Sequence, residues 1–420
     1  MDVSRTRSSR VLGRVLSVML CVAAVALVRG ADVPPVMTRA TPESVGLAAS
    51  ALGDATSLLN RFVQERKVAG AAAAVARHGK IAYIEAAGVQ DLETRAPMSE
   101  RSIFRIYSMT KPVTAAAVMM LWEEHRFDLK DPVSKYLPEF DAVRVRPSAA
   151  DASRAPSRAI TIEDLLLHTS GLNHRTSEVY QRAQVRSRAI ALPQFVANIV
   201  RVPLMEDPGT RYRYSEATTV LGRLVEIWSG KPFDGFLDRR VFSPLGMSDT
   251  GFWVAPADRG RLTTVYAPAP GGGLTPIEIE TLPFTERPAL LEGAVGLVST
   301  VPDYLRFGQM LLNNGMLGGV RLLQASTVAL MTANRLSDSI VSARGGIGWA
   351  LLNVNVALDA ATFNYPVSRG EYGWDGSAGT IFWVDPSLDM VTVLMTQSVP
   401  PNPDGFRQEF KTRIRKSAVK

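Results

Sequence analysis

The chain has 420 residues, of which 46% are hydrophobic and 21% are charged, and its formal net charge is +7. This composition excludes a disordered, collagen-like or coiled-coil protein and is sufficient for a large buried core. No basic stripe interleaved with aromatic residues is present, so we predict no nucleic-acid partner.

The first thirty residues predict an export signal. Arginines at positions 5, 7, 10 and 14 precede an apolar run at 15–28, and small residues follow at 30–31. This order is typical of a secretory signal peptide. The apolar run is shorter than the about 20 residues that span a bilayer, and an uncleaved anchor is the alternative. Removal of residues 1–30 takes away five arginines and one aspartate and lowers the net charge from +7 to +3.

We therefore predict an exported protein, periplasmic or secreted, with no stable membrane insertion after signal cleavage. The single cysteine, Cys21, lies in the predicted signal. The mature chain would then have no thiol nucleophile, disulfide or cysteine metal ligand. None of the four histidines has the H-E-x-x-H or H-x-H spacing of a zinc site. We predict no metal and no cofactor.

The predicted elements begin with a hairpin. Two short apolar runs, at 69–76 and 81–87, are separated by a short polar turn, which is typical of paired strands. The next element is a helix over 108–125, which is apolar on nearly all sides and should therefore be buried. Pro112 is compatible only with the first turn of a helix, so this helix should begin close to Ser108.

The middle of the chain is predicted to be helical and rich in loops. Two threonines, each with an aspartate three residues later, resemble capping boxes that begin helices: Thr161 with Asp164 and Thr300 with Asp303. The second of these helices should end at Asn314-Gly315. Long loops are expected at 144–160 and 266–277.

Strand-like runs return in the last hundred residues, at 346–349, 380–384 and 390–394. We therefore predict an α/β fold, with an antiparallel sheet formed by the N- and C-terminal segments, flanking helices, and a large, mostly helical inserted domain. The active site is expected at the interface of the two domains, a sheet domain at 31–107 plus 343–420 and a helical domain at 108–342.

One chemical motif is S-x-x-K, at Ser108 and Lys111. Residues three apart on a helix share a face, with Cβ atoms about 5–6 Å apart, so the hydroxyl and the amine can face the same space. The pattern recurs at Ser417 and Lys420, where fraying is expected, so it does not by itself establish a reaction centre. The alternative is an ordinary helix start whose lysine reaches solvent.

A serine nucleophile also needs a base and donors for the developing oxyanion. The G-x-S-x-G elbow of an α/β-hydrolase is absent, since the segment 246–251 is one residue too long. Burial lowers the pKa of a lysine and leaves a neutral amine, so Lys111 is one candidate base. Tyr214, just beyond a turn signal at 207–209, is a second, because a phenol near an ammonium group becomes more acidic. A packing role for Tyr214 is an equal alternative.

A third element is the stretch of small residues at 373–379, which leads into a predicted strand. Small residues let a backbone approach a ligand closely. A backbone N–H in this stretch is thus a candidate oxyanion donor, together with that of Ser108. The alternative is an edge strand in which the glycines only relieve crowding.

Three motifs, Ser108–Lys111, Tyr214–Glu216 and Trp374–Gly376, occur in this order. With their flanking segments they cover roughly 42–398, and they resemble the motifs of the penicillin-recognising serine hydrolases: class C β-lactamases, DD-peptidases and family VIII carboxylesterases. The resemblance implies a β-lactamase/transpeptidase-like fold. It also implies four roles: Ser108 as nucleophile, Lys111 as its base, Tyr214 as proton carrier to the leaving group, and the N–H groups of Ser108 and Ser377 as oxyanion hole.

Two positions depart from the β-lactamase pattern. The second motif there usually ends in asparagine, whose amide donates and accepts, whereas Glu216 stands here. The third motif there begins with a lysine that pairs with substrate carboxylates, whereas Trp374 stands here and Asp375 follows. The lost cation and the added anion should disfavour carboxylate-bearing substrates. The predicted substrate contacts are Trp374, Asp375, Gly376 and Glu216.

The Trp-x-Gly form of the third motif resembles that of the esterases in this group more than that of the β-lactamases. We therefore predict a serine carboxylesterase that acts through a covalent acyl-enzyme on a small-molecule ester or amide. One alternative is a class C-type β-lactamase or DD-peptidase. Another is a non-catalytic wall-binding protein that kept the fold. The sequence makes no prediction of oligomeric state.

Overall fold

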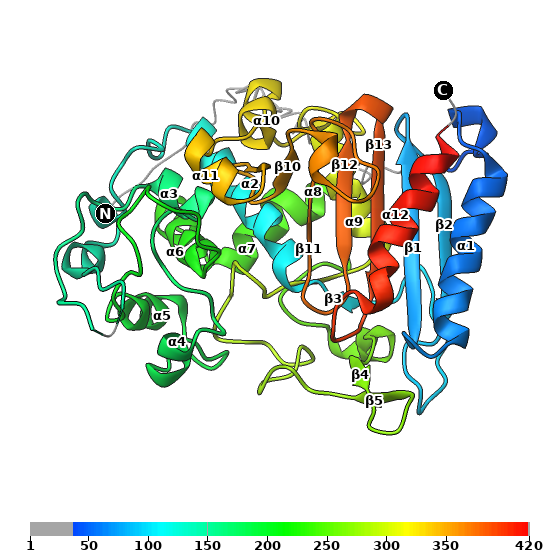
Figure 1. Cartoon of the computed structure of the whole chain (residues 1–420), viewed down its shortest axis with the longest axis horizontal. Helices are drawn as coiled ribbons and strands as arrows, with labels where there is room; N and C mark the ends of the chain where they lie inside the picture. The colour runs from blue at the N-terminus through cyan, green and yellow to red at the C-terminus, as the bar shows by residue number, and fades with distance from the viewer. Residues whose placement is uncertain (1–36, 149, 419–420) are drawn as a thin grey trace, which may run out of the picture. The chain divides into compact units, whose positions relative to one another are not determined.

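The computed structural model describes residues 37–148 and 150–418. The predicted signal peptide and Lys420 therefore lie outside the described residues. A seven-stranded sheet runs in the order β2-β1-β13-β12-β11-β10-β9, and every neighbouring pair is antiparallel (Figure 1). Its strands come from both ends of the described chain: β1 (Gly70–Arg77), β2 (Lys80–Gly88), β9 (Ile347–Trp349), β10 (Asn355–Ala357), β11 (Tyr372–Asp375), β12 (Ile381–Asp385) and β13 (Met390–Thr396). The predicted fold class is confirmed.

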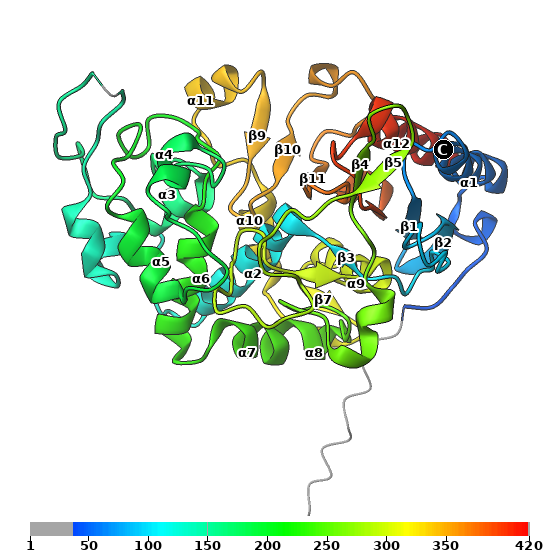
Figure 2. The same cartoon turned by 90° about the horizontal axis from the view of Figure 1, so that it is seen from below.

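Strand β1 is rich in alanine and lies between β2 and β13. Successive side chains of a strand point to opposite faces, and Ala71, Ala73 and Val75 accordingly join a different buried cluster from Ala72 and Ala74. Helices α1 (Ala49–Gln64) and α12 (Phe406–Ser417) pack on the first face, and α9 (Val301–Leu312) packs on the second (Figure 2). The small side chains let helices approach both faces closely.

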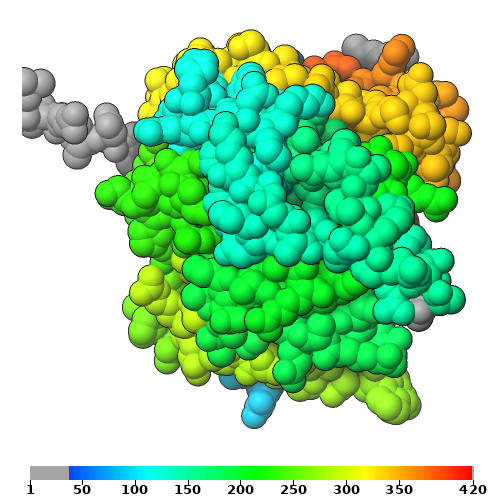
Figure 3. Space-filling view, turned by 90° about the vertical axis from the view of Figure 1, so that its left-hand side faces the viewer, coloured from blue at the N-terminus to red at the C-terminus, as the bar shows by residue number. Residues whose placement is uncertain are grey.

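Most of the regular secondary structure in the segment between the two groups of strands is helical. Figure 3 shows a face of the molecule formed largely by this segment, coloured cyan to green. Besides α9, its α-helices are α2 (Thr110–Glu123), α3 (Ile162–Leu167), α4 (Glu178–Arg182), α5 (Leu192–Ile199), α6 (Ala217–Ser229), α7 (Phe233–Leu237), α8 (Ser243–Leu245), α10 (Ala325–Thr332) and α11 (Asp338–Ala343). The described residues, 37–148 and 150–418, belong to one compact unit, and the boundaries proposed from the sequence for a sheet domain and a helical domain stay a prediction.

Three short strand pairs lie outside the main sheet: β3 (Phe104–Arg105) with β6 (Val298–Ser299), β4 (Tyr266–Pro268) with β5 (Leu274–Pro276), and β7 (Met316–Leu317) with β8 (Val320–Arg321). The β4–β5 hairpin corrects the predicted loop at 266–277. Its turn contains three successive glycines with positive φ. Because this glycine-rich composition is typical of a loop, the short flanking strands were not predicted.

The predicted buried helix is confirmed as α2, in which every residue from Thr110 to Leu121 is buried. The predicted capping box at Thr161 is also confirmed, since Thr161 Oγ1 accepts from Asp164 N at 3.2 Å and Asp164 Oδ2 accepts from Thr161 N at 2.9 Å. The second box is only half formed. Thr300 accepts from Asp303 N, but the Asp303 carboxylate instead binds the segment at 249–250, whose N–H and hydroxyl groups compete for it.

We expect Thr161→Ala to lower the free energy of unfolding by about 1 kcal/mol, because the cap of α3 loses its acceptor. Urea denaturation measures this change. Ser177→Ala is the matched control, since Ser177 is the N-cap residue of α4 but makes no capping hydrogen bond. Equal losses of unfolding free energy in the two variants would contradict the assignment of Thr161 as a capping residue.

Candidate active site

Ser108 and Lys111 lie where a 3₁₀ turn, Tyr107–Met109, continues into α2. Lys111 Nζ is 3.5 Å from Ser108 Oγ. The preceding residue, Tyr107, has φ of +40°, a region that is unfavourable for residues other than glycine. Its ring is fully buried and meets Phe284 edge-on at 6.0 Å between centroids. Packing therefore holds a strained backbone immediately before the nucleophile candidate, as is common at reactive sites.

The amine of Lys111 has no exposed surface. Its Nζ donates to Ala294 O at 3.0 Å and lies 4.5 Å from the centre of the Tyr214 ring. Burial lowers the pKa of Lys111 to about 7, and Arg175 contributes in the same direction against the opposing charges of Glu216 and Glu292. The alternative of a lysine that reaches solvent is therefore wrong. A substantial fraction of the amine is neutral near pH 7 and has a lone pair available for the Ser108 proton.

Tyr214 connects the second motif with the third. Its phenol oxygen accepts a hydrogen bond from Trp374 Nε1 at 3.1 Å, and the two rings are 5.3 Å apart. Burial raises the pKa of Tyr214 well above its usual value, and the Ser108 hydroxyl only partly opposes this. The prediction of a more acidic phenol is thus wrong, because the effect of burial is larger than that of the hydrogen bonds from Ser108 and Trp374. Tyr214 is therefore protonated near neutral pH.

The third motif ends β11 and turns at 376–379 into β12. A Cβ on Gly376 would lie 2.4 Å from Ile106 O, so only glycine allows this turn to approach the segment before Ser108. Ser377 is exposed, and its N–H has no acceptor among the described residues. Strand β11 lies between β10 and β12. The edge-strand alternative is therefore wrong, and the turn that approaches the segment before Ser108 carries an N–H without an acceptor among the described residues.

Asp375 does not present an unpaired charge. Arg407, from α12, binds Asp375 Oδ2 through Nη1 at 2.8 Å. Its Nη2 also donates to the carbonyl oxygens of Gly376 and Thr380, at 2.8 and 3.0 Å. Arg407 therefore compensates the charge of Asp375 and holds the turn that contains Ser377 in place. This pairing weakens the predicted repulsion of substrate carboxylates by Asp375.

Glu216 is completely buried, so it is not exposed to a substrate in this structure, contrary to the predicted contact. Its Oε2 accepts from Thr219 Oγ1 at 3.0 Å. Burial raises the pKa of Glu216, and Glu292 raises it further, against the effects of Lys111 and two arginines. The N-terminus of α6 favours an ionised carboxylate by at most about 2 kcal/mol. Removing a carboxylate from water costs several kcal/mol, so burial has the larger effect.

An ionic network behind the site was not predicted from the sequence. Arg186 binds Glu292 with two nitrogens, one of them at 2.7 Å from Oε2, and binds Glu280 at 2.8 Å. Arg175 binds the other oxygen of Glu280 at 3.0 Å. Burial alone would raise the pKa of Glu292, but Arg186 outweighs this effect and holds it below its usual range. No pattern of neighbouring residues indicates this network, because its arginines and glutamates are brought together by the fold.

Two histidines surround Tyr214, with ring centroids 4.9 Å (His168) and 5.6 Å (His174) from its ring. His168 is fully buried, and its Nδ1 lies 3.1 Å from Ser215 Oγ. Burial, followed by the charge of Lys111, lowers the pKa of His174 to about 4 and that of His168 well below its usual value. Both imidazoles are neutral near pH 7 and pack the phenol. Their Nδ1 atoms form hydrogen bonds with Ser215 and Thr176. Because Lys111 Nζ instead lies 3.5 Å from Ser108 Oγ, Lys111 is the better placed base.

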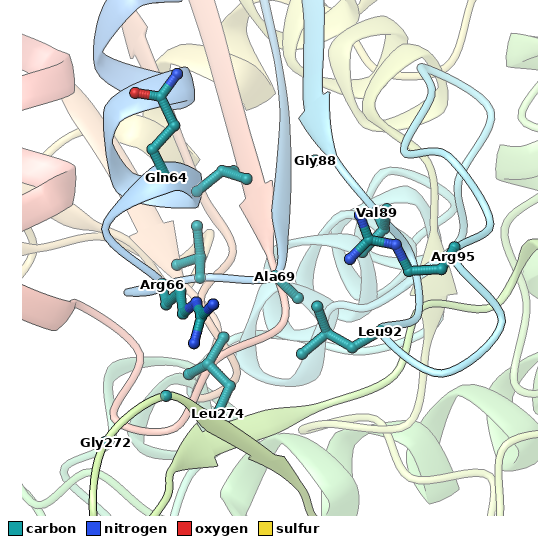
Figure 4. Close-up of a pocket in the computed structure, with 12 residues that line it drawn as sticks. Gln64, Arg66, Ala69, Gly88, Val89, Leu92, Arg95, Gly272 and Leu274 are labelled. Carbon is teal, nitrogen blue, oxygen red and sulfur yellow. The ribbon is translucent and has the colours of Figure 1, made fainter.

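Cavity size does not locate this site. A cavity of about 530 Å³ lies between the end of α1, the ends of β1 and β2, and the β4–β5 turn, with Arg66 and Arg95 on its walls (Figure 4). None of the three motifs lines it. A smaller cavity of about 110 Å³ is lined by Trp374 and Asp375 together with Tyr365 and other residues. The convergence of functional groups, not volume, identifies the candidate site.

Comparisons with known proteins agree with this geometry. Residues 55–414 match the family described as Beta-lactamase. Esterase EstB of Burkholderia gladioli is 31% identical over 84% of this chain and 91% of its own length. A putative D-alanyl-D-alanine carboxypeptidase of Escherichia coli (strain K12) is 25% identical over 88% of this chain and 87% of its own length.

One solved structure extends the comparison to three dimensions. EstCE1, a hydrolase with promiscuous acyltransferase activity, superimposes with a TM-score of 0.76 at 27% identity, covering 88% of this chain and 99% of its own. The family match spans most of the sequence, and the fold and the meeting of the three motifs agree with it. The chain belongs to the beta-lactamase family of serine hydrolases.

Proposed function

We propose that this protein is a serine carboxylesterase that acts on small-molecule esters through an acyl-enzyme. The observation that carries this proposal is the buried amine of Lys111, whose pKa is lowered to about 7 and which lies 3.5 Å from Ser108 Oγ and against the Tyr214 ring. A hydroxyl, an unprotonated base and a protonated phenol in one site are the components of acyl transfer without histidine.

In the first half-reaction, the Lys111 amine takes the Ser108 proton as Oγ forms a bond to the ester carbonyl carbon. The N–H groups of Ser108 and Ser377 hold the resulting oxyanion. When the intermediate collapses, Tyr214 gives its proton to the departing alcohol and recovers a proton from the Lys111 ammonium. Water then attacks the acyl-Ser108 ester by the reverse proton path, which releases the acid and restores the hydroxyl.

The ester class is favoured by the third motif. Trp374 supplies an indole where a substrate-binding lysine would stand in β-lactamases, and Arg407 is already bound to Asp375. The similarity to EstB and EstCE1 supports the same class. The carboxypeptidase relative supports a DD-peptidase as the alternative, and a catalytically silent binding protein is a further one.

We expect short nitrophenyl esters to be hydrolysed and a chromogenic cephalosporin to remain intact, because the third motif offers no free cation to the cephalosporin carboxylate. Parallel spectrophotometric assays on the purified chain measure both. Faster turnover of the cephalosporin than of the esters would favour the β-lactamase alternative. Labelling of Ser108 by a fluorophosphonate without turnover of any ester would favour the binding protein.

Ser108→Ala should lower kcat/KM for nitrophenyl esters by at least about 10³-fold, because the acceptor of the acyl group is lost. Thermal unfolding should change little, since only one oxygen atom is removed. Ser417→Ala, in the second S-x-x-K pattern, is the control and should keep its activity. Parental rates in Ser108→Ala would show that another residue is the nucleophile.

The pH dependence of kcat/KM should show an acid limb with a midpoint near 7, the value to which burial lowers the pKa of Lys111. Only the neutral amine accepts the Ser108 proton, so activity falls as the pH decreases through this value and Lys111 becomes protonated. Initial rates between about pH 5 and pH 9 measure the midpoint. A flat profile across this range would contradict lysine as the base.

We also propose that the protein is exported to the periplasm or the medium. The order of residues in the first thirty positions supports this, and no helix among the described residues is both apolar and long enough to cross a bilayer. Expression of the full chain followed by N-terminal sequencing tests the proposal. A mature start close to residue 31 is expected, and an intact Met1 on cytoplasmic protein would contradict it.

A further inference from the structure

We propose that Glu216 works as a neutral carboxylic acid that positions the Lys111 amine, and that the Arg186–Glu292 ion pair maintains this neutral state. The inference rests on the proposed esterase mechanism, in which Lys111 is the base. Glu216 would act through other groups, since its side chain has no exposed surface. It is therefore a positioning residue and not a substrate contact.

The first observation is the absence of a counter-ion. Glu216 takes part in none of the ion pairs that the structure places between described residues. Its Oε2 has one partner, Thr219, and its buried Oε1 has none. A fully buried carboxylate with a single neutral donor would be an uncompensated charge, a state that proteins avoid by binding a proton.

The second observation is the distribution of nearby charges. Two charged groups that act on Glu216 are Lys111 of α2 and Glu292. The others come from the region of α4: Arg175 precedes this helix, Arg186 follows it, and Tyr180 lies within it. Arg186 binds Glu292 and Glu280, and Arg175 binds Glu280. Both arginines are therefore already paired. Glu292 is bound to Arg186, and its negative charge repels an ionised Glu216. This repulsion raises the pKa of Glu216 beyond the effect of burial.

The third observation is a chain of hydrogen bonds from Glu216 to the base. Thr219 Oγ1 donates to Glu216 Oε2 at 3.0 Å and accepts from Ala294 N at 3.3 Å. The Ala294 carbonyl in turn accepts from Lys111 Nζ at 3.0 Å. With one N–H directed at Ala294, rotation of the amine is restricted, and its lone pair can be kept toward Ser108.

The peptide at the centre of this chain has little freedom to move. A Cβ on Gly293 would lie 2.6 Å from Thr218 O, and Gly293 O accepts from Thr114 Oγ1 at 2.7 Å. Glu292 anchors the same turn, since its carbonyl accepts from Gly296 N at 2.8 Å. The Glu292 side chain and the Ala294 carbonyl are thus fixed by one short segment. This links the ion pair to the orientation of the base.

The neutral state of Glu216 also affects the protonation of Lys111. An ionised Glu216 would stabilise the Lys111 ammonium and so remove the base near neutral pH. A protonated carboxyl both donates and accepts, as the amide of glutamine does. Glutamine at position 216 should therefore reproduce its function, whereas alanine should not.

The experiment compares the pH dependence of nitrophenyl ester hydrolysis in Glu216→Gln, Glu216→Ala and the parent. We expect Glu216→Gln to lose no more than about threefold in kcat/KM, and Glu216→Ala to lose at least about tenfold. The acid midpoint should stay in place in Glu216→Gln, because one neutral group replaces another. A shift of this midpoint to lower pH would show that Glu216 is charged and overturn the proposal. Parental activity in Glu216→Ala would overturn the positioning role.

Glu292→Gln tests the role of the ion pair, since it removes the carboxylate that binds Arg186 and repels an ionised Glu216. Glu216 should ionise in this variant and replace the lost negative charge near Lys111, so the acid midpoint should not move to lower pH. A midpoint that moves to lower pH would show that Glu216 stays neutral without the pair, and would overturn that part of the proposal. Infrared difference spectra of parent minus Glu216→Gln give a readout independent of turnover. At neutral pH they should contain the C=O band of a protonated carboxyl, and carboxylate bands alone would overturn the proposal. If the parent hydrolyses no ester, the proposed function fails, and the spectrum still reports the state of Glu216.

Discussion

The burial of one amine is the constraint on which the site depends. Lys111 lies in a helix that is buried on every side from Thr110 to Leu121. In such surroundings the charged form of a lysine loses its hydration, and the neutral form becomes accessible near pH 7. The same burial prevents the amine from reaching solvent and directs it to Ser108 and Ala294. Position and basicity of the group thus have a common origin in the packing of α2.

The charged side chains around this amine form ion pairs with one another. Arg186 is bound to Glu280 and Glu292, and Arg407 is bound to Asp375. These pairs compensate the full charges that lie close to the site. Electrostatic groups that are fixed before the reaction are effective because they need no reorganisation during it. The polar groups left without protein partners, such as the Ser377 N–H, are then available to the reacting atoms.

The sheet contributes by bringing distant segments together. Strand β11 carries Trp374 to Tyr214, and the turn after it approaches the residues before Ser108 closely enough to require Gly376. Helix α12, from the end of the described chain, reaches the same turn through Arg407. Three motifs separated by more than a hundred residues therefore meet because antiparallel pairing aligns the C-terminal strands beside those of the N-terminal segment.

Local patterns were sufficient for much of this. Short apolar runs predicted β1, β2, β9, β12 and β13, but β10 and β11 were not predicted. The buried helix after Ser108 and the capped start of α3 were predicted because each follows from neighbouring residues alone. The order of the three motifs indicated the family, which the comparisons confirm. The β4–β5 hairpin was missed because its strands are short and its turn is rich in glycine.

What the sequence determined by itself was the identity and order of the reactive groups. Only the tertiary structure decided their protonation and their partners. The high pKa of Tyr214, the isolation of Glu216 and the pairing of Asp375 with Arg407 all depend on which distant segments exclude water or supply charge. These are properties of three-dimensional neighbours, and a pattern of adjacent residues contains no information about them, because solvation and Coulomb interaction depend on distance in space and not along the chain.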